Sequence, residues 1–409
     1  MKIGVLRIPN SELYFRIKQG GFIMGLPLEG IKVIDFTQYQ QGTVGTLLLA
    51  DWGANVIKVE PRLTGEPGRT SGLAYYQAHN RNKRSVTIDL KKKKGKEIIY
   101  RLVKDADIFA QNFRPGVADR LGFGYEALSA INPRIIYLTG SGFGLKGPWK
   151  DKPGFDAVGQ AMGGIMSLAG PPGSPDLPIG AAVADQTGGF MLGYGALLAL
   201  FDRQKTGKGQ MVEASLMGSV IGLIGWVMQA YLLSGYIPTK GRARVGSGVF
   251  SCTLRAGDGK SLIIQTFGRA AKEKVFNAVG LDPKDPRFET GEKMRQNIDE
   301  LIAAMEGFFS TKTRDECLEI LGKEDVVCAP VYNLAEVAAE PQVSANEYLV
   351  EIEHPKEGKI RILNNPVTLS KQKARVGAAP ELGQHTEEVL KEAGYSEAEI
   401  TAFRQEEVI

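Results

Sequence analysis

The chain has 409 residues, of which 43% are hydrophobic and 23% charged, so it can bury a large core and form two domains. Its 50 Lys and Arg residues and 46 Asp and Glu residues give a formal net charge of +4. This balance predicts no nucleic-acid partner but is compatible with small polyanionic ligands. The three cysteines form no CxxC pair and the three histidines lack metal-ligand spacing. We therefore expect no disulfide framework, no metal site and a reducing, cytoplasmic location.

Two segments raise the question of targeting or membrane insertion. Residues 1–23 carry charged side chains throughout and lack the continuous apolar core of a signal peptide, so we expect a disordered extension or an upstream start. The uncharged stretch 216–234 is about as long as a bilayer-spanning helix, but it contains glycines and polar side chains and lacks aromatic and basic girdles. We therefore expect a core helix there and no membrane partner.

Strand-like and helix-like segments alternate along the first half of the chain. This alternation is typical of βαβ units, in which ligands bind at the carboxyl ends of the parallel strands. It predicts an α/β fold with a Rossmann-like large domain over 24–233. The expected strands are 31–35, 55–60, 107–111, 134–140 and 211–214, and the expected helices are 42–52, 94–105 and 125–131.

The second half of the chain predicts a smaller α/β domain over 250–334. Gly, Arg and Ser replace the apolar pattern over 234–249, which indicates a linker and a glycine-bearing loop. The polar, proline-containing remainder, 335–409, would be a return linker and the C-terminal part of the large domain. Within these regions we expect a strand over 261–266 and helices over 294–310, 313–321 and 387–407.

One carboxylate stands between small residues just before a long apolar, helical stretch. Asp185 follows Ala-Ala-Val-Ala and precedes Gln-Thr-Gly-Gly. An aspartate before a helix is most often a cap for backbone N–H groups. Here the small neighbours leave the carboxylate unshielded, and helix-end N–H groups would favour the ionised form that a nucleophile needs. Asp185 is therefore the candidate nucleophile.

Two other patterns carry less weight. The run Gly-Phe-Gly-Leu-Lys-Gly over 142–147 satisfies the letters of a dinucleotide fingerprint. However, Pro148 and Trp149 follow where a helix should open, which argues against a nucleotide oxidoreductase. The four lysines at 91–94 are more often a solvated helix start than an anion site, although phosphates also bind at helix starts.

Several segments together resemble one family, the class III CoA-transferases, which include formyl-CoA transferase and crotonobetaine CoA-transferase. The matching segments occur in the family's order, and the resemblance covers nearly everything after Met24. Several ordered segments are far more specific than any one of them. They are residues 27–37, 53–60, 82–86, 112–116, 154–157, the segment around Asp185, and 206–210.

The resemblance implies a transferase that moves CoA from an acyl-CoA thioester to a carboxylic acid, with succinyl-CoA as a reasonable donor. Asp185 would attack the thioester to give an acyl-aspartyl anhydride, and the CoA thiolate would convert this into an aspartyl-CoA thioester. An acceptor acid would then repeat the steps in reverse. Coenzyme A is thus a substrate, and no permanently bound cofactor is implied.

The resemblance also implies where the substrates bind. Each candidate CoA residue could instead be a plain surface or core residue. Arg62 is the least direct match, because Pro61 stands where formyl-CoA transferases have an arginine. Phe155 replaces a tyrosine of those enzymes, and the glycine-rich loop of the small domain is shorter here. The CoA-binding candidates are Gln38, Gln40, Arg62, Lys91, Asn112, Phe113 and Arg120, and the substrate-pocket candidates are Phe155, Gly246, Ser247 and Gly248.

Two alternative functions remain open. The related α-methylacyl-CoA racemases have a histidine in the position of Phe155, and without it an isomerase lacks an acid/base group on that side. A scaffold subunit of a heteromeric CoA-transferase is the other alternative, although the presence of Asp185 argues against it. The family fold is an interlocked dimer of ring-shaped chains. We therefore expect a homodimer, or a heteromer with a related subunit, and no folded monomer on dilution.

Overall fold

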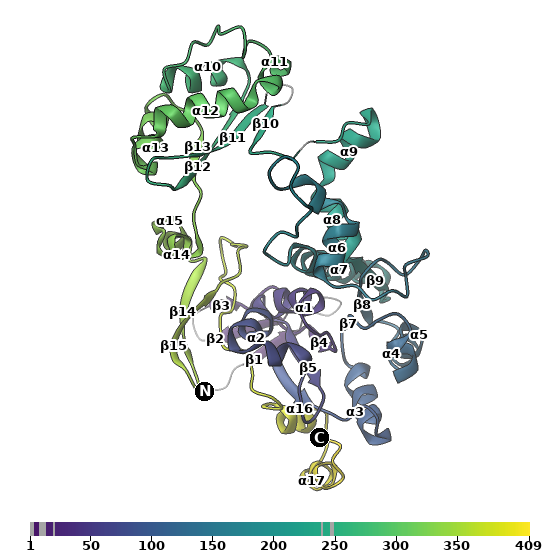
Figure 1. Cartoon of the computed structure of the whole chain (residues 1–409). Coiled ribbons are helices and arrows are strands. Elements are labelled where there is room, and N and C mark those ends of the chain that lie inside the picture. The colour runs from purple at the N-terminus through teal and green to yellow at the C-terminus, as the bar shows by residue number, and fades with distance from the viewer. Residues whose placement is uncertain (1–3, 8–13, 19–20, 239, 246–248) are drawn as a thin grey trace. The chain divides into compact units, whose positions relative to one another are not determined.

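The computed structural model describes the chain except residues 1–3, 8–13, 19–20, 239 and 246–248. The chain forms two compact units (Figure 1). The larger unit consists of Met1–Met166, Pro178–Tyr236 and Ser344–Ile409, and the smaller one of Ser167–Leu177 and Ile237–Val343. The candidate glycine-loop residues Gly246, Ser247 and Gly248 lie outside the described residues.

A six-stranded sheet forms the centre of the larger unit, with the order β6-β5-β4-β7-β8-β9 and every neighbouring pair parallel. The predicted α/β fold with a parallel sheet is therefore confirmed. The chain runs outward from β4 through β5 to β6 and then returns to β7 on the other side of β4. In such sheets the reversal point opens a crevice at the carboxyl ends of the strands. The strands are β4 (Lys32–Asp35), β5 (Asn55–Glu60), β6 (Arg84–Thr87), β7 (Ile108–Gln111), β8 (Ile136–Ser141) and β9 (Met211–Ser215).

Helices cover both faces of this sheet, because successive apolar side chains of each strand point to opposite sides. Ile34, Ile57 and Phe109 belong to the core under α3 (Lys93–Lys104), α5 (Tyr125–Ile131), α16 (Thr386–Glu392) and α17 (Glu397–Gln405). Val33 and Ile108 belong to the opposite core, under α1 (Gln41–Asp51) and α7 (Val183–Thr206). The sheet thus has a buried apolar core on each of its two faces.

Helices α1 and α7 pack very closely. A Cβ on Gly45 would come within 3.0 Å of the Leu192 Cβ, and a Cβ on Gly189 would come within 2.5 Å of the Val44 Cβ. Only glycine permits this approach of the two backbones. The close packing brings the first turn of α7 next to the first turn of α1.

Shorter elements complete the larger unit. Three antiparallel strands are described before residue 25, and the disordered extension expected over 1–23 stays a prediction. These strands are β1 (Gly4–Arg7), β2 (Tyr14–Lys18) and β3 (Gly21–Met24). The other elements are η1 (Pro67–Ser71), α2 (Leu73–Asn80), α4 (Val117–Leu121), α6 (Asp156–Met162), η2 (Ile165–Leu168), β14 (Leu349–His354) and β15 (Gly358–Leu363).

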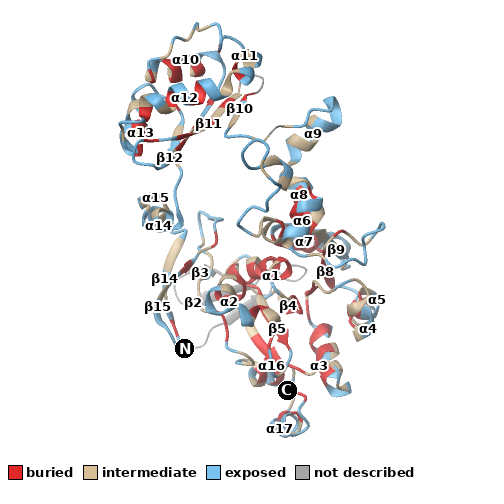
Figure 2. Ribbon diagram, viewed as in Figure 1, coloured by how far each residue is buried: buried red, intermediate tan, exposed pale blue. Residues whose placement is uncertain are grey.

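Two expected helices are each broken in the structure. The stretch 216–234 forms α8 (Leu216–Leu223) and α9 (Gly225–Ser234), bent by 77° at Ile224. The expectation of one core helix was wrong, because α9 has no buried residue and Trp226 is 69% exposed (Figure 2). Within the described part of the chain no single helix could cross a membrane, and α8 and α9 pass that test only as a bent pair. The expected helix 387–407 is interrupted at Gly394, where φ is 81°.

The smaller unit is an antiparallel sheet covered by helices. Its core contains Phe250, Leu262, Phe276 and Leu301, among other buried apolar side chains. The strand order is β10-β11-β12-β13, all antiparallel. The strands are β10 (Ala243–Val245), β11 (Val249–Arg255), β12 (Ser261–Phe267) and β13 (Cys328–Pro330), and the helices are α10 (Arg269–Ala278), α11 (Gly291–Gln296), α12 (Ile298–Phe309), α13 (Arg314–Lys323), α14 (Leu334–Ala339) and α15 (Pro341–Ala345).

Candidate active site

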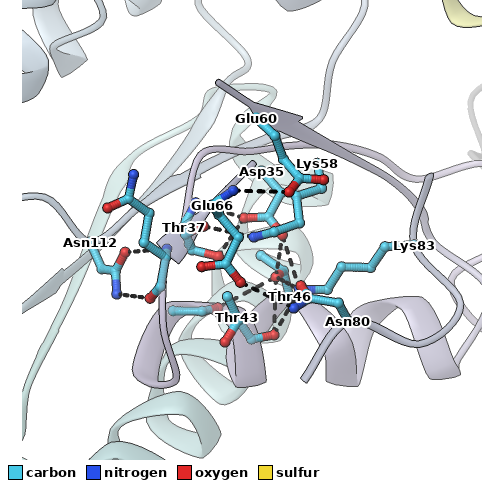
Figure 3. Close-up of polar contacts among 12 residues, drawn as sticks. Asp35, Thr37, Thr43, Thr46, Lys58, Glu60, Glu66, Asn80, Lys83 and Asn112 are labelled. Atoms are coloured by element: carbon cyan, nitrogen blue, oxygen red, sulfur yellow. Dashed lines mark hydrogen bonds and ion pairs between the residues drawn. The ribbon is translucent and has the colours of Figure 1, made fainter. Parts of the chain in front are cut away.

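The loop between β4 and α1 is held by a buried polar network (Figure 3). Asp35 ends β4, and its carboxylate accepts hydrogen bonds from the backbone N–H and hydroxyl of Thr37, at 2.8 and 2.5 Å, and from the Thr46 hydroxyl at 2.8 Å. The Lys83 ammonium lies 3.1 Å from the same carboxylate, and both side chains are fully buried. The Lys58 ammonium donates to the Thr37 carbonyl at 2.7 Å. The network therefore fixes the backbone that leads into residues 38–40.

Tyr39, in the middle of this loop, has a left-handed φ of 57°. Such a conformation costs free energy in a residue with a large side chain, so neighbouring contacts must support it. The buried Glu66 carboxylate accepts the Tyr39 N–H at 3.1 Å and the Gly68 N–H at 2.8 Å. Its other oxygen accepts from the Asn80 amide at 3.4 Å. Glu66 thus connects the loop to η1 and to the end of α2.

The structure brings two of the predicted CoA-binding residues together at the carboxyl ends of β4 and β7. The Gln38 N–H donates to Asn112 Oδ1 at 2.7 Å, and Asn112 Nδ2 donates to the Gln38 carbonyl at 2.8 Å (Figure 3). Phe113 is half-buried, and its ring centroid lies 6.5 Å from that of Phe36. Gln40 is the residue before α1, and its carbonyl accepts the Val44 N–H at 2.9 Å.

The other three CoA-binding candidates also follow carboxyl ends of strands in the sheet. Arg62 comes after β5 and forms an ion pair with Glu407 at 3.1 Å. Lys91 is exposed in the turn between β6 and α3, and Arg120 is exposed on α4, which follows β7. All seven candidates therefore lie on the side of the sheet where ligands of such folds bind.

Asp185 is the third residue of α7 and is not the helix cap. The residue before the helix, Ala182, makes no side-chain cap. Instead Asp156, the first residue of α6, caps α7 from outside. Its Oδ1 accepts the N–H of Ala184 at 2.8 Å and the N–H of Asp185 at 3.1 Å. The alternative that Asp185 caps the helix is therefore wrong, because Asp156 accepts the N–H groups of the first turn of α7.

Asp185 is hard to ionise for an aspartate. Burial raises its pKa to about 7, the negative charge of Asp156 adds to this effect, and a backbone hydrogen bond from Gln41 opposes it. We had expected helix-end N–H groups to favour the carboxylate. That expectation was wrong, because two of those N–H groups are donated to Asp156. A carboxylate of this basicity is present at neutral pH and is a better nucleophile than an ordinary aspartate.

Aromatic side chains lie near the residues that flank this carboxylate. Phe155 precedes α6, is 60% exposed, and meets Tyr39 edge to face with centroids 6.0 Å apart. Tyr75 on α2 has a raised pKa because of burial first and then the negative charges of Asp185 and Glu66. Phe155 itself has no hydroxyl, but Tyr75 therefore brings a protonated phenol into the neighbourhood of Asp185.

Three residues near Asp185 were not predicted from the sequence. Gln41, Tyr75 and Asp156 reach Asp185 only through the packing of α1, α2 and α6. Asp156 lies inside a segment that resembles the family, 154–157, and Gln41 directly follows the candidate Gln40. Their position beside predicted site residues was the only signal in the sequence. For Tyr75 the sequence offered none. Among the residues that the structure describes, no group of three or more His, Cys, Asp or Glu side chains could hold a metal ion.

The parallel sheet and the carboxylate of Asp185 beyond its carboxyl edge define an α/β protein with a candidate active site, and comparison with known proteins gives its family. Residues 28–386 match the model of CoA-transferase family III. The chain therefore belongs to CoA-transferase family III, as the resemblance implied, and is an enzyme of the transferase class that acts on CoA thioesters.

Several relatives are similar over their whole length. The formyl-CoA:oxalate CoA-transferase of Afipia carboxidovorans is 33% identical over 413 residues, covering 93% of this chain and 97% of that protein. The enzyme with the same name from Escherichia coli O6:H1 is 33% identical over 416 residues, covering 94% and 100%. Among solved structures, a CAIB/BAIF family protein from Brucella suis superimposes with a TM-score of 0.81 at 33% identity, covering 90% of this chain and 100% of that one.

Proposed function

We propose that the protein transfers CoA from an acyl-CoA to a carboxylic acid through covalent intermediates on Asp185. The observation that carries the proposal is the partly buried carboxylate of Asp185, with a pKa of about 7, beside a backbone N–H donor, Gln41, and a phenol, Tyr75. The names of the relatives make formyl-CoA and oxalate the first donor and acceptor to test. Succinyl-CoA is the second donor.

The proposed chemistry balances without a cofactor. The Asp185 carboxylate attacks the thioester carbonyl, the C–S bond breaks, and CoA leaves as a thiolate from an acyl-aspartyl anhydride. The thiolate attacks the aspartyl carbonyl and displaces the donor carboxylate, leaving an aspartyl-CoA thioester. The acceptor carboxylate displaces the thiolate again, and the thiolate takes the acceptor acyl group and frees Asp185. Each step forms an oxyanion that N–H or O–H donors must stabilise, and the Gln41 N–H and the Tyr75 hydroxyl are the candidate donors.

CoA itself is proposed to bind along the carboxyl ends of β4 to β7. Gln38, Gln40, Asn112 and Phe113 follow the carboxyl ends of β4 and β7, and the cations of Arg62, which is half-buried, and of Lys91 and Arg120, which are exposed, would contact phosphates. We expect Arg120→Ala to raise the KM for the acyl-CoA about tenfold with kcat unchanged, because a phosphate contact far from the carbonyl binds ground state and transition state equally. A KM equal to that of the wild type would remove Arg120 from the site.

The covalent step is tested by trapping. The protein is incubated with formyl-CoA, and separately with succinyl-CoA, quenched with hydroxylamine and digested for peptide mass spectrometry. An activated Asp185 would be converted into its hydroxamate, and samples without acyl-CoA are the control. The rate of trapping should rise with pH through about 7, since only the ionised carboxylate attacks. The absence of any adduct with a panel of acyl-CoA esters would overturn the proposal.

The surface of α7 supports the proposed dimer. Apolar side chains recur on the helix at spacings of three and four residues and remain exposed in the single chain, 59% for Tyr194 and 60% for Phe201. A contiguous apolar face of this kind is typical of a surface that another chain covers. The other members of the face are Phe190, Met191, Leu197 and Leu198.

We therefore predict an obligate dimer in solution. Because dissociation would expose this face to water, sedimentation at decreasing protein concentration should show dimer, or unfolding together with dissociation, and no folded monomer. A folded monomer at all concentrations would contradict the interlocked arrangement.

A further inference from the structure

Gln160 is a fully buried amide on α6 whose hydrogen bonds converge on the start of α7. Its Nε2 donates to Asp156 Oδ2 at 2.6 Å and lies 3.3 Å from the Ala181 carbonyl. Its Oε1 accepts the Ile179 N–H at 2.9 Å. One side chain thus holds both a carboxylate and the backbone segment that leads into the helix of the nucleophile.

These contacts continue to Asp185. Asp156 uses Oδ2 for Gln160 and Oδ1 for the N–H groups of Ala184 and Asp185. Because Ala182 provides no side-chain cap, this external carboxylate is the side-chain partner of the first turn of α7. The orientation of Asp156 therefore decides where the backbone of Asp185 lies, and Gln160 holds that orientation.

We propose that Gln160 is a positioning residue of the CoA-transfer reaction, which acts through Asp156 to hold the first turn of α7 where Asp185 reacts. The inference rests on the proposed function, in which Asp185 is the nucleophile. Gln160 makes no contact with the substrate in this proposal. Replacing Gln160 should therefore change the acyl-transfer step and the ionisation of Asp185, with little change in the binding of the acyl-CoA.

The charged and titratable groups around Asp185 give the sign of the expected pH effect. Asp156 faces it from α6 and Tyr75 from α2, with Glu66 and Tyr39 adjoining Tyr75, while Gln41 donates from α1. The N–H of Gln160 partly neutralises the charge of Asp156. Without it more of that negative charge acts on Asp185, so the nucleophile should ionise at higher pH.

A double-mutant cycle tests this route. Gln160→Met keeps the length of the side chain and removes its hydrogen bonds. We expect it to slow trapping of Asp185 about tenfold at pH 7 and to move the pH midpoint of trapping upward by roughly half a unit, with KM for the acyl-CoA within about twofold. Asp156→Asn should move the midpoint downward, since a negative neighbour is lost. In the Asp156→Asn background, Gln160→Met should leave the midpoint unchanged.

A matched control exists elsewhere in the same unit. Gln77 is also a buried amide clamp, donating to the Gly377 carbonyl at 2.9 Å and accepting the Ala379 N–H at 2.7 Å. Gln77→Met should lower thermal stability without moving the pH midpoint. If Gln160→Met behaves in the same way, or shifts the midpoint equally in both backgrounds, Gln160 is a structural residue and the inference fails.

A second measurement does not depend on chemistry. Hydrogen exchange of a peptide that contains Ala184 and Asp185 should be faster in Gln160→Met than in Gln77→Met, because the Asp156 cap is loosened. If the wild type forms no adduct, the proposed function fails, and this exchange still decides the positioning role. Equal protection in the two variants would overturn it. Should Gln160→Met not fold, Gln160→Glu, which keeps the shape and the acceptor, must also raise the midpoint.

Discussion

Asp185→Ala is expected to lower the rate of CoA transfer by at least about a thousand-fold, because the covalent route has no substitute nucleophile. The neighbouring carboxylate of Asp156 is already committed to the N–H groups of Ala184 and Asp185 and to Gln160. It therefore cannot take over without uncapping α7. The rate is measured by chromatography of the CoA esters formed from formyl-CoA and oxalate, and from succinyl-CoA with a panel of acids.

Two variants control this experiment. Asp202→Ala removes an exposed carboxylate from the same helix and should leave the rate within about twofold, as surface changes usually do. Asp185→Asn keeps the shape of the nucleophile without its charge and reports on the fold. Since the folded state raises the pKa of Asp185 to about 7, ionisation costs stability as pH rises from about 4 to 7, and this variant should melt above the wild type at pH 8. Substantial turnover by Asp185→Ala would sink the covalent assignment.

The sequence predicted the elements whose pattern is dictated locally. The strand predicted over 55–60 coincides with β5, and the small residues around Asp185 do open a long helix. β6 escaped prediction because its four residues, Arg-Ser-Val-Thr, are short and mostly polar, although the sheet buries three of them. The bend between α8 and α9 escaped prediction because the uncharged pattern of residues 216–234 is the same in a straight helix and in a broken one.

Individual residues of the candidate site could be predicted from the sequence, but most of the interactions between them could not. Asp185 and the pair Gln38 and Asn112 were named from the sequence, and the structure places that pair in contact. The raised pKa of Asp185 was not predictable, because it depends first on burial by tertiary packing and then on the charge of Asp156, which lies 29 residues earlier and takes up the helix N–H groups. Charges that meet through tertiary packing leave no periodic trace in a sequence.

The buried ion pair below the 38–40 loop has consequences for both stability and function. Lys83 and Asp35 are fully buried, and the Lys83 ammonium also contacts the Thr43 carbonyl at 2.9 Å and Asn80 Oδ1 at 3.0 Å. Burial lowers the pKa of Lys83 to about 8, so the ammonium form still dominates at pH 7. The nearby cations of Lys83 and Lys58 and hydrogen bonds from threonines outweigh burial at Asp35 and lower its pKa. Both partners are therefore charged at neutral pH.

Lys83→Met is expected to destabilise the protein by about 3 kcal/mol at pH 7, because it leaves the Asp35 carboxylate buried with only Lys58 nearby. Urea unfolding at fixed protein concentration measures this change. The loop that carries Gln38, Tyr39 and Gln40 is tied to the same network, so the KM for the acyl-CoA should rise in parallel.

The double variant Asp35→Asn/Lys83→Met separates the loss of the pair from the loss of packing. Removing both charges leaves no unpaired ion in the interior, so this variant should be more stable than Lys83→Met alone. If the free energy of unfolding of Lys83→Met falls by less than about 1 kcal/mol, the ion pair stabilises the protein no more than an exposed salt bridge would. The Asp35 carboxylate would then be neutral or solvated, and the loop would owe its position to Glu66 and to the Gln38–Asn112 contacts instead.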